Sequence, residues 1–127
     1  MAKVKENREH IILKDQEIDA TGKSLGRISS EIAGLLIGKD GLDFSRNKIP
    51  NRKVKIKNAS KIEIENKKQE QKKLKSYSGF PSGLKEETLG KFIKRRGISE
   101  TLKKTVYGML PKNKLRQRMI KNLIISE

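Results

Sequence analysis

The chain has 127 residues and carries 31 Lys and Arg against 15 Asp and Glu, so its formal net charge is +16. Self-repulsion of this size opposes a compact state and favours a polyanionic partner that neutralises it. The sequence has no cysteine, which excludes disulfides, thiolate metal sites and cysteine nucleophiles. Its longest run of apolar residues and glycine, 32–38, is far shorter than the ~20 residues that span a bilayer, so we expect no membrane partner.

The chain length predicts a single domain over residues 1–127. Residues 1–14 are mostly polar and charged, and we expect them to form a basic N-terminal arm. The first strand is expected either at 11–13 or at 17–20. Polar residues at 15–17 leave its boundaries open.

Residues 25–37 carry the clearest helical pattern in the chain. Ser24 is a suitable N-cap and Gly38 a suitable end, because glycine adopts the left-handed conformation that closes many helices. Arg27 and Glu31 have the i,i+4 spacing of an ion pair. The apolar positions fall on one face and predict a buried stripe: Leu25, Ile28, Ile32, Leu35 and Leu36.

Two alternating stretches follow a predicted loop over 39–51. Apolar and charged residues alternate at 54–56 and again at 62–64, so both predict strands with one solvated face. Taken alone, this pattern indicates an antiparallel sheet covered on one side. The residues 67–75 are expected to form a hairpin arm or a connection that leads to Tyr77.

The C-terminal half alternates between loops, helices and one strand. Residues 78–84 are rich in glycine and proline and predict a loop. Helices are expected over 88–96 and 99–109, and a last strand over 123–126. The second of these helices has three apolar residues in register: Leu102, Val106 and Met109.

The segment 107–119 combines a helix stop, a proline restart and a basic helix. Gly108 and Pro111 interrupt the backbone pattern. Leu115, Met119 and Leu123 recur at helical spacing and predict a buried stripe. The remaining positions are crowded with cations and point to a phosphate backbone as the partner: Lys112, Lys114, Arg116 and Arg118.

One short motif suggests nucleotide binding. Thr-Gly-Lys-Ser at 21–24 lies where a phosphate-binding loop would lie, but such a loop needs a glycine where this chain has Glu17. A carboxylate there would repel phosphate, which argues against nucleotide hydrolysis. The milder interpretation is that the helix start holds one phosphate of a nucleic acid, against the alternative of a capped helix with solvated cations. The residues concerned are Lys23, Ser24 and Arg27.

The sequence offers few catalytic groups. His10 is the only histidine, and it has no cysteine or second histidine with which to share a metal. The adjacent acids Glu86 and Glu87 would diverge on a helix, where they would complement its dipole. We therefore expect no enzyme, no cofactor, no metal site and no small-molecule substrate.

The loop at 78–85 has a composition suited to close contact. Gly79, Pro81 and Gly83 predict an irregular backbone that can approach another chain. We expect Phe80 to pack the loop, while backbone amides and Lys85 dock on RNA. Stacking of aromatic side chains on bases is the weaker alternative.

Three segments together resemble a known family. Ile-Asp-Ala-Thr-Gly-Lys-Ser-Leu-Gly-Arg at 18–27, Ser-Gly-Phe-Pro-Ser-Gly-Leu-Lys-Glu-Glu-Thr at 78–88 and Gly-Met-Leu-Pro-Lys-Asn-Lys-Leu at 108–115 are similar to signature segments of the universal large-subunit ribosomal protein family thirteen, in its bacterial form. The resemblance implies a three-layer α/β/α domain around a mainly parallel four-stranded sheet. It also implies a structural, non-enzymatic component of the cytoplasmic ribosome that binds large-subunit rRNA early in assembly, beside neighbouring large-subunit proteins.

This chain departs from the family pattern at 16–17, 48–52 and 76–80, and it ends at Glu127, before the customary C-terminal extension. Two other functions stay open: a general basic nucleic-acid-binding protein outside the ribosome, and a nucleotide-dependent enzyme that uses the 21–27 turn. The expected RNA-binding residues are Lys23, Ser24, Arg27, Gly79, Pro81, Gly83, Lys85, Lys112, Lys114, Arg116 and Arg118.

Overall fold

The centre of the molecule is a parallel sheet of three strands in the order β1-β2-β5. In this computed structural model, which describes residues 14–42 and 44–127, β1 spans Gln16–Asp19, β2 spans Val54–Lys57 and β5 spans Leu123–Ile125. The register pairs Gln16 with Val54, and Val54 with Leu123. The predicted first strand at 17–20 is therefore confirmed within one residue. The alternative at 11–13, His10 and nearly all of the predicted arm lie outside the described residues.

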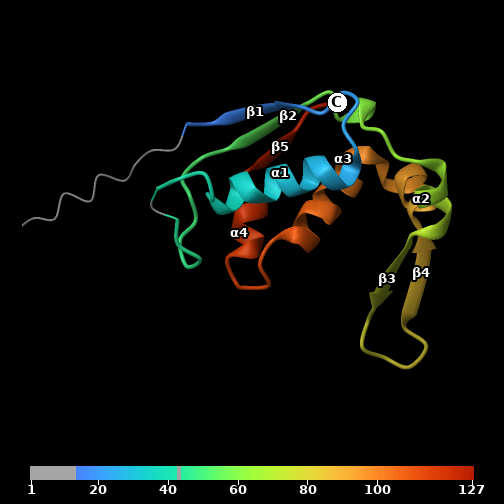
Figure 1. Ribbon diagram of the computed structural model, residues 1–127. Helices are drawn as coiled ribbons and strands as arrows, with labels where there is room; N and C mark the ends of the chain where they lie inside the picture. Colours follow the sequence, from blue (N-terminus) through green and yellow to red (C-terminus); the bar gives the residue numbers. More distant parts are fainter. Residues whose placement is uncertain (1–13, 43) are drawn as a thin grey trace, which may run out of the picture.

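One face of this sheet is buried and the other is exposed. Ile18, Val54 and Ile56 point into the core, where the helices α1, α3 and α4 lie on one side of the strands (Figure 1). On the opposite face, Glu17 and Lys57 are exposed and form an ion pair at 2.6 Å. The α/β class and the parallel sheet are thus confirmed. Within the described residues, however, this sheet has three strands with helices on one side, so the fourth strand and the third layer implied by the resemblance are not found there.

The helix α1, Leu25–Ile37, forms where the sequence predicts it. Its predicted apolar stripe is buried except for Leu35, which is half-buried, and Gly38 ends the helix in a left-handed conformation with φ 85°. Ser24 occupies the N-cap position in extended conformation, without a side-chain capping hydrogen bond. The expected partner of Glu31 is wrong: its carboxylate accepts from the Lys23 ammonium at 3.1 Å, rather than from Arg27.

A buried arginine fixes the chain after α1. The Arg52 side chain is 1% exposed, and its Nη1 donates to Asp40 Oδ2 at 2.7 Å. Its Nε donates at 2.9 Å to the Leu35 carbonyl in the last turn of α1, which also accepts from the Gly38 amide at 3.2 Å. Arg52 therefore joins the loop before β2 to the end of this helix.

The predicted strand at 62–64 is wrong. Asn58 has a left-handed backbone with φ 58°, and the chain turns there into the short 3₁₀ helix η1, Ala59–Lys61. Only Glu63 makes a sheet-like contact, an isolated parallel bridge to Ser24. Ile62 is nevertheless 7% exposed and belongs to the core, so its apolar character reflects burial beside the sheet instead of strand pairing.

A two-stranded antiparallel hairpin extends away from the core (Figure 1). It consists of β3, Lys73–Tyr77, and β4, Leu84–Thr88, and follows the short helix α2, Asn66–Gln71. The loop predicted at 78–84 is its turn. Glu86 and Glu87 lie in β4, not in the first turn of a helix as expected, because the helix begins only after Thr88.

The helix α3, Leu89–Met109, includes both helices predicted in this region, joined at a kink. Gly97 forms the kink with φ 87° and ψ 169°, values outside the helical range. Leu102 and Val106 are buried as predicted. Met109, by contrast, is 42% exposed, so its predicted place in the buried stripe is wrong.

The basic segment after α3 is less helical than predicted. Gly108 does not stop the helix, which continues through it and ends after Met109. The following helix α4 spans only Arg116–Ile120. Met119 is buried as expected, but Leu123 reaches the core from β5, not from a continuing helical stripe.

Candidate nucleic-acid interface

The start of α1 presents two exposed cations, Lys23 and Arg27. Lys23 is exposed but its ammonium contacts Glu31. Arg27 is exposed and forms no ion pair within residues 14–42 and 44–127. Ser24 forms an isolated parallel bridge with Glu63, in which the Glu63 amide donates to the Lys23 carbonyl at 3.1 Å. Backbone pairing therefore covers one side of this helix start. Arg27 is therefore the strongest candidate for a phosphate contact in this group.

The hairpin turn is a tightly constrained loop. Gly79 has φ 87°, and the Gly83 amide donates to the Phe80 carbonyl at 3.0 Å across Pro81 and Ser82. Pro81 followed by Ser82 at φ 62° is the pattern of a type II turn. A side chain at Gly83 would collide with the Phe80 carbonyl oxygen at 2.9 Å. The glycines and the proline thus shape the loop, as their sequence pattern predicts.

The expected role of Phe80 inside this loop is wrong. Its side chain is 73% exposed, and Tyr77 is 66% exposed, so neither packs the turn from within. The register places Tyr77 opposite Leu84, which is 56% exposed. Lys85 is also exposed and is in no ion pair in the part of the chain that the structure describes.

The basic segment before β5 presents its cations from a turn and a short helix. Lys112, Lys114 and Arg118 are exposed, and none of them joins an ion pair among the described residues. Arg116 is half-buried and its guanidinium lies 3.9 Å from the centre of the Tyr107 ring. The Nε of Arg116 is buried and has no hydrogen-bond partner among the described residues, so this side chain is held there by stacking more than by hydrogen bonds.

The structure does not gather these three groups into one site. The hairpin tip extends from one end of the molecule, whereas α4 lies near the other end, beneath the sheet in Figure 1. The predicted residues are therefore spread over a broad surface. Such a distribution suits a partner with many anionic groups over a large area, and it does not suit a small ligand.

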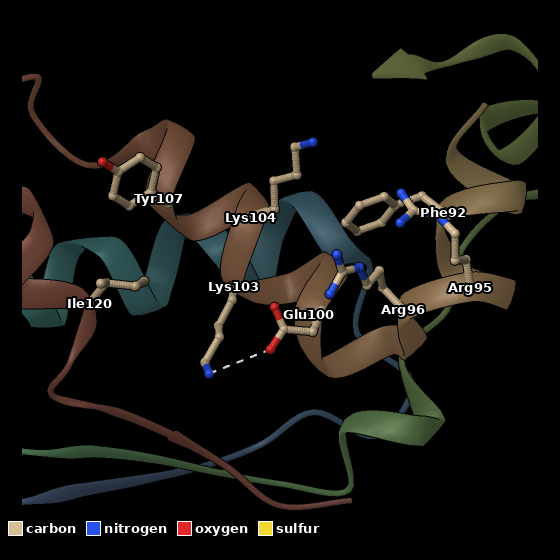
Figure 2. Close-up of a pocket in the computed structure, with 8 residues that line it drawn as sticks. All are labelled: Phe92, Arg95, Arg96, Glu100, Lys103, Lys104, Tyr107 and Ile120. Carbon is tan, nitrogen blue, oxygen red and sulfur yellow. Dashed lines mark ion pairs between the residues drawn. The ribbon is translucent and has the colours of Figure 1, made fainter. Parts of the chain in front are cut away.

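A basic hollow along α3 was not predicted from the sequence. This α3 hollow has a volume of about 410 Å³ and is lined by Phe92, Arg95, Arg96, Glu100, Lys103, Lys104, Tyr107 and Ile120. Four of these side chains are cationic and one is acidic. Figure 2 shows Phe92 and Tyr107 at opposite ends of the hollow, with Arg96 and Glu100 between them. The density of basic residues after position 91 was a signal for this region, but the residues that share the hollow depend on the kink at Gly97.

The cations at one end of the α3 hollow are held in place. Arg95 donates through Nε and Nη2 to the Glu87 carboxylate at 3.0 and 2.6 Å, and this hydrogen bonding lowers the pKa of Glu87 and raises that of Arg95. The Lys104 ammonium lies 4.8 Å from the Phe92 ring centre and the Arg95 guanidinium lies 5.5 Å from it. A ring that faces two cations orients both of them.

Across residues 14–42 and 44–127, no three side chains of His, Cys, Asp or Glu are grouped so that they could hold a metal ion. In the same part of the chain, no helix is both long and apolar enough to cross a membrane.

The comparison with known proteins agrees with the basic surface. The family described as Ribosomal protein L13 matches residues 14–126. The chain belongs to the ribosomal protein L13 family. It is 44% identical over 106 residues to the large ribosomal subunit protein uL13 of Aquifex aeolicus, a match that covers 84% of this chain and 73% of the relative. The uL13 proteins of Citrifermentans bemidjiense and Thermus thermophilus are each 43% identical, over 108 and 106 residues, covering 85% and 84% of this chain and 75% of each relative.

Membership in the L13 family answers the broad question of function. Its members are structural components of the large ribosomal subunit and are not enzymes, so this L13 chain is a ribosomal protein of the cytoplasmic, bacterial-type ribosome and takes part in translation. The alternative of a nucleotide-dependent enzyme at the 21–27 turn is therefore wrong. The resemblance of its three signature segments to this family is confirmed.

Proposed function

We propose that this L13 chain binds large-subunit rRNA, contacts neighbouring large-subunit proteins and supports early assembly of the subunit. The observation that carries the proposal is the set of exposed cations that have no acidic partner among the described residues: Arg27, Lys85, Lys112, Lys114 and Arg118. Cations that are not neutralised within the protein are available to displace counterions from RNA phosphates. Their spread over opposite ends of the molecule favours a large folded RNA.

The other predicted residues have supporting roles in this proposal. Gly79, Pro81 and Gly83 shape the hairpin turn so that its backbone can approach RNA closely. Lys23 must share its charge with Glu31 and contributes less than Arg27. Arg116 presents the edge of its guanidinium while its face stacks on Tyr107.

The salt dependence of RNA binding tests the proposal. The affinity of the purified chain for large-subunit rRNA fragments should fall steeply with salt, and each lost phosphate contact should reduce the slope of log K against log salt by about 0.7 to 0.9. Lys114→Gln and Arg118→Gln should each show this reduction. Lys57→Gln is the control, because Lys57 is already paired with Glu17 on the exposed sheet face.

Two further measurements address specificity and assembly. Equal affinity for an unrelated duplex of the same length would favour the alternative of a general nucleic-acid-binding protein. Cells depleted of the chain should accumulate precursors of the large subunit, detected by sedimentation through a sucrose gradient. Normal amounts of mature large subunits after depletion would contradict the role in assembly.

A further inference from the structure

The α3 hollow combines a large excess of positive charge with a concave shape. Arg95, Arg96, Lys103 and Lys104 line it against the single acid Glu100. Glu100 lies 3.7 Å from the Lys103 ammonium and both side chains are exposed, so this pair is weak and leaves Lys103 available to another anion. Arg96 and Lys104 join no ion pair in the described part of the chain. The net charge of the lining therefore favours an anionic ligand.

The Phe92 ring faces two of these cations, Arg95 and Lys104, and the Tyr107 ring faces Arg116, which lies outside the lining. At one end of the hollow, the Phe92 ring faces Lys104 and Arg95, and at the other end Tyr107 lies beneath the Arg116 guanidinium at 3.9 Å. Long basic side chains normally lose considerable rotamer entropy when they bind an anion. Rings that already restrict them reduce this cost, so the hollow is partly organised for binding before a ligand arrives.

The kink in α3 determines which residues line the hollow. In a straight helix, Phe92 and Lys104 would be separated by about 18 Å along the axis. The break at Gly97 allows the ammonium of Lys104 to lie 4.8 Å from the centre of the Phe92 ring. The kink therefore turns two basic helix segments into the walls of one hollow.

The size and form of the hollow indicate which kind of anion fits. A volume of about 410 Å³ exceeds what one phosphate group fills and lies in the range of sites for nucleotide-sized ligands. The hollow is open along α3, so a polymer can enter and leave it, whereas a free nucleotide would remain largely in solvent. We infer that the α3 hollow binds a segment of the sugar–phosphate backbone of rRNA, with Arg96, Lys103 and Lys104 on its phosphates. This inference rests on the proposed rRNA binding and adds a site to it.

Matched pairs of substitutions separate this site from the general effect of charge. Lys104→Gln should weaken binding to the rRNA fragment about tenfold, whereas Lys94→Gln, an exposed cation of the same helix that does not line the hollow, should change it less than about threefold. Glu100→Gln should strengthen binding about threefold, because it removes the acid from the lining. Glu70→Gln on α2 makes the same change of charge away from the hollow and is its control.

The outcomes distinguish this inference from the proposed function. A wild-type chain that fails to bind any large-subunit rRNA fragment overturns both. A wild-type chain that binds, with Lys104→Gln equal to Lys94→Gln and Glu100→Gln equal to Glu70→Gln, overturns the α3 hollow alone. A defect in folding cannot imitate the result, because Glu100→Gln is expected to gain affinity.

Two additional measurements define the ligand. Phe92→Leu keeps every charge but removes the ring that orients Lys104 and Arg95, so it should weaken rRNA binding about fivefold while the salt slope stays unchanged. Photocrosslinking with 4-thiouridine in the rRNA should give crosslinked peptides from 92–107. Displacement of the rRNA by micromolar ATP would overturn the assignment to an RNA backbone in favour of a free nucleotide.

Discussion

The ion pair between the buried Arg52 and the exposed Asp40 predicts that loss of the exposed partner destabilises the fold more than loss of the buried one. Asp40 is the more exposed partner, with 40% of its side chain accessible, whereas the Arg52 side chain is 1% exposed. Asp40→Ala leaves a buried guanidinium with only the Leu35 carbonyl as an acceptor, and we expect a loss of about 3 to 5 kcal/mol in the free energy of unfolding. Arg52→Met leaves a carboxylate that water can reach and a Leu35 carbonyl without this donor. It should cost less, about 2 to 3 kcal/mol.

Urea denaturation followed by circular dichroism measures these changes, since the chain has no tryptophan to serve as a fluorescent probe. The double variant Asp40→Ala, Arg52→Met should lose less free energy of unfolding than the sum of the two single variants, because it leaves no unpaired buried charge.

The hydrogen bonds from Arg52 also lower the pKa of Asp40. The stability that the pair contributes should therefore persist above the ordinary carboxyl pKa near 3.8 and disappear as the pH falls through the lowered pKa. A cost below about 1 kcal/mol for Asp40→Ala would refute the assignment of Arg52 as a buried, pair-dependent charge.

Three smaller predictions concern the backbone and acid stability. Ser82→Gly should stabilise the hairpin turn by about 0.5 kcal/mol, since glycine adopts the observed φ of 62° without strain, and slower hydrogen exchange of hairpin amides would show it. Gly97→Ala should lower the free energy of unfolding, measured by urea denaturation, by about 1 to 3 kcal/mol. The cost comes from conformational strain at φ 87° and not from a clash, since an added Cβ would meet no atom within 4 Å. An unchanged urea midpoint would contradict this prediction. Asp19 accepts hydrogen bonds from the Thr21 amide and hydroxyl and from Asn58, which lower its pKa to about 2. The stability it contributes should be present above pH 3.8 and lost toward pH 2, so Asp19→Asn should flatten the pH dependence of the urea midpoint in that interval.

Local patterns in the sequence predicted most of the individual elements. The 3.6-residue period and the Gly38 end placed α1 correctly, because both signals arise within one segment. The glycines and proline at 79–83 predicted a loop for the same reason, but not that it joins two paired strands. Even the interruption of α3 was visible, since the pattern breaks between 96 and 99 where Gly97 forms the kink.

Features that depend on distant segments could not be predicted in this way. The alternation at 54–56 is compatible with either strand direction, and only the pairing with β1 and β5 makes the sheet parallel. The alternation at 62–64 gave a false strand, because apolar residues in a coil that packs on a core can have the same period. The α3 hollow was missed because its lining depends on a kink angle, and charge density alone says nothing about which cations share a surface.

The pairing of the central strand also affects how the chain reaches its folded state. β2 pairs with β1, which precedes it by 38 positions (Gln16 to Val54), and with β5, which follows it by 69 positions (Val54 to Leu123). Pairings of such long sequence separation slow folding, and while β5 is absent one edge of β2 has unpaired backbone groups beside Val54 and Ile56. An open edge of this kind promotes association between incomplete chains. The net charge of +16 keeps such chains apart through mutual repulsion, so the residues that suit the finished protein to a polyanion also protect it during its own synthesis.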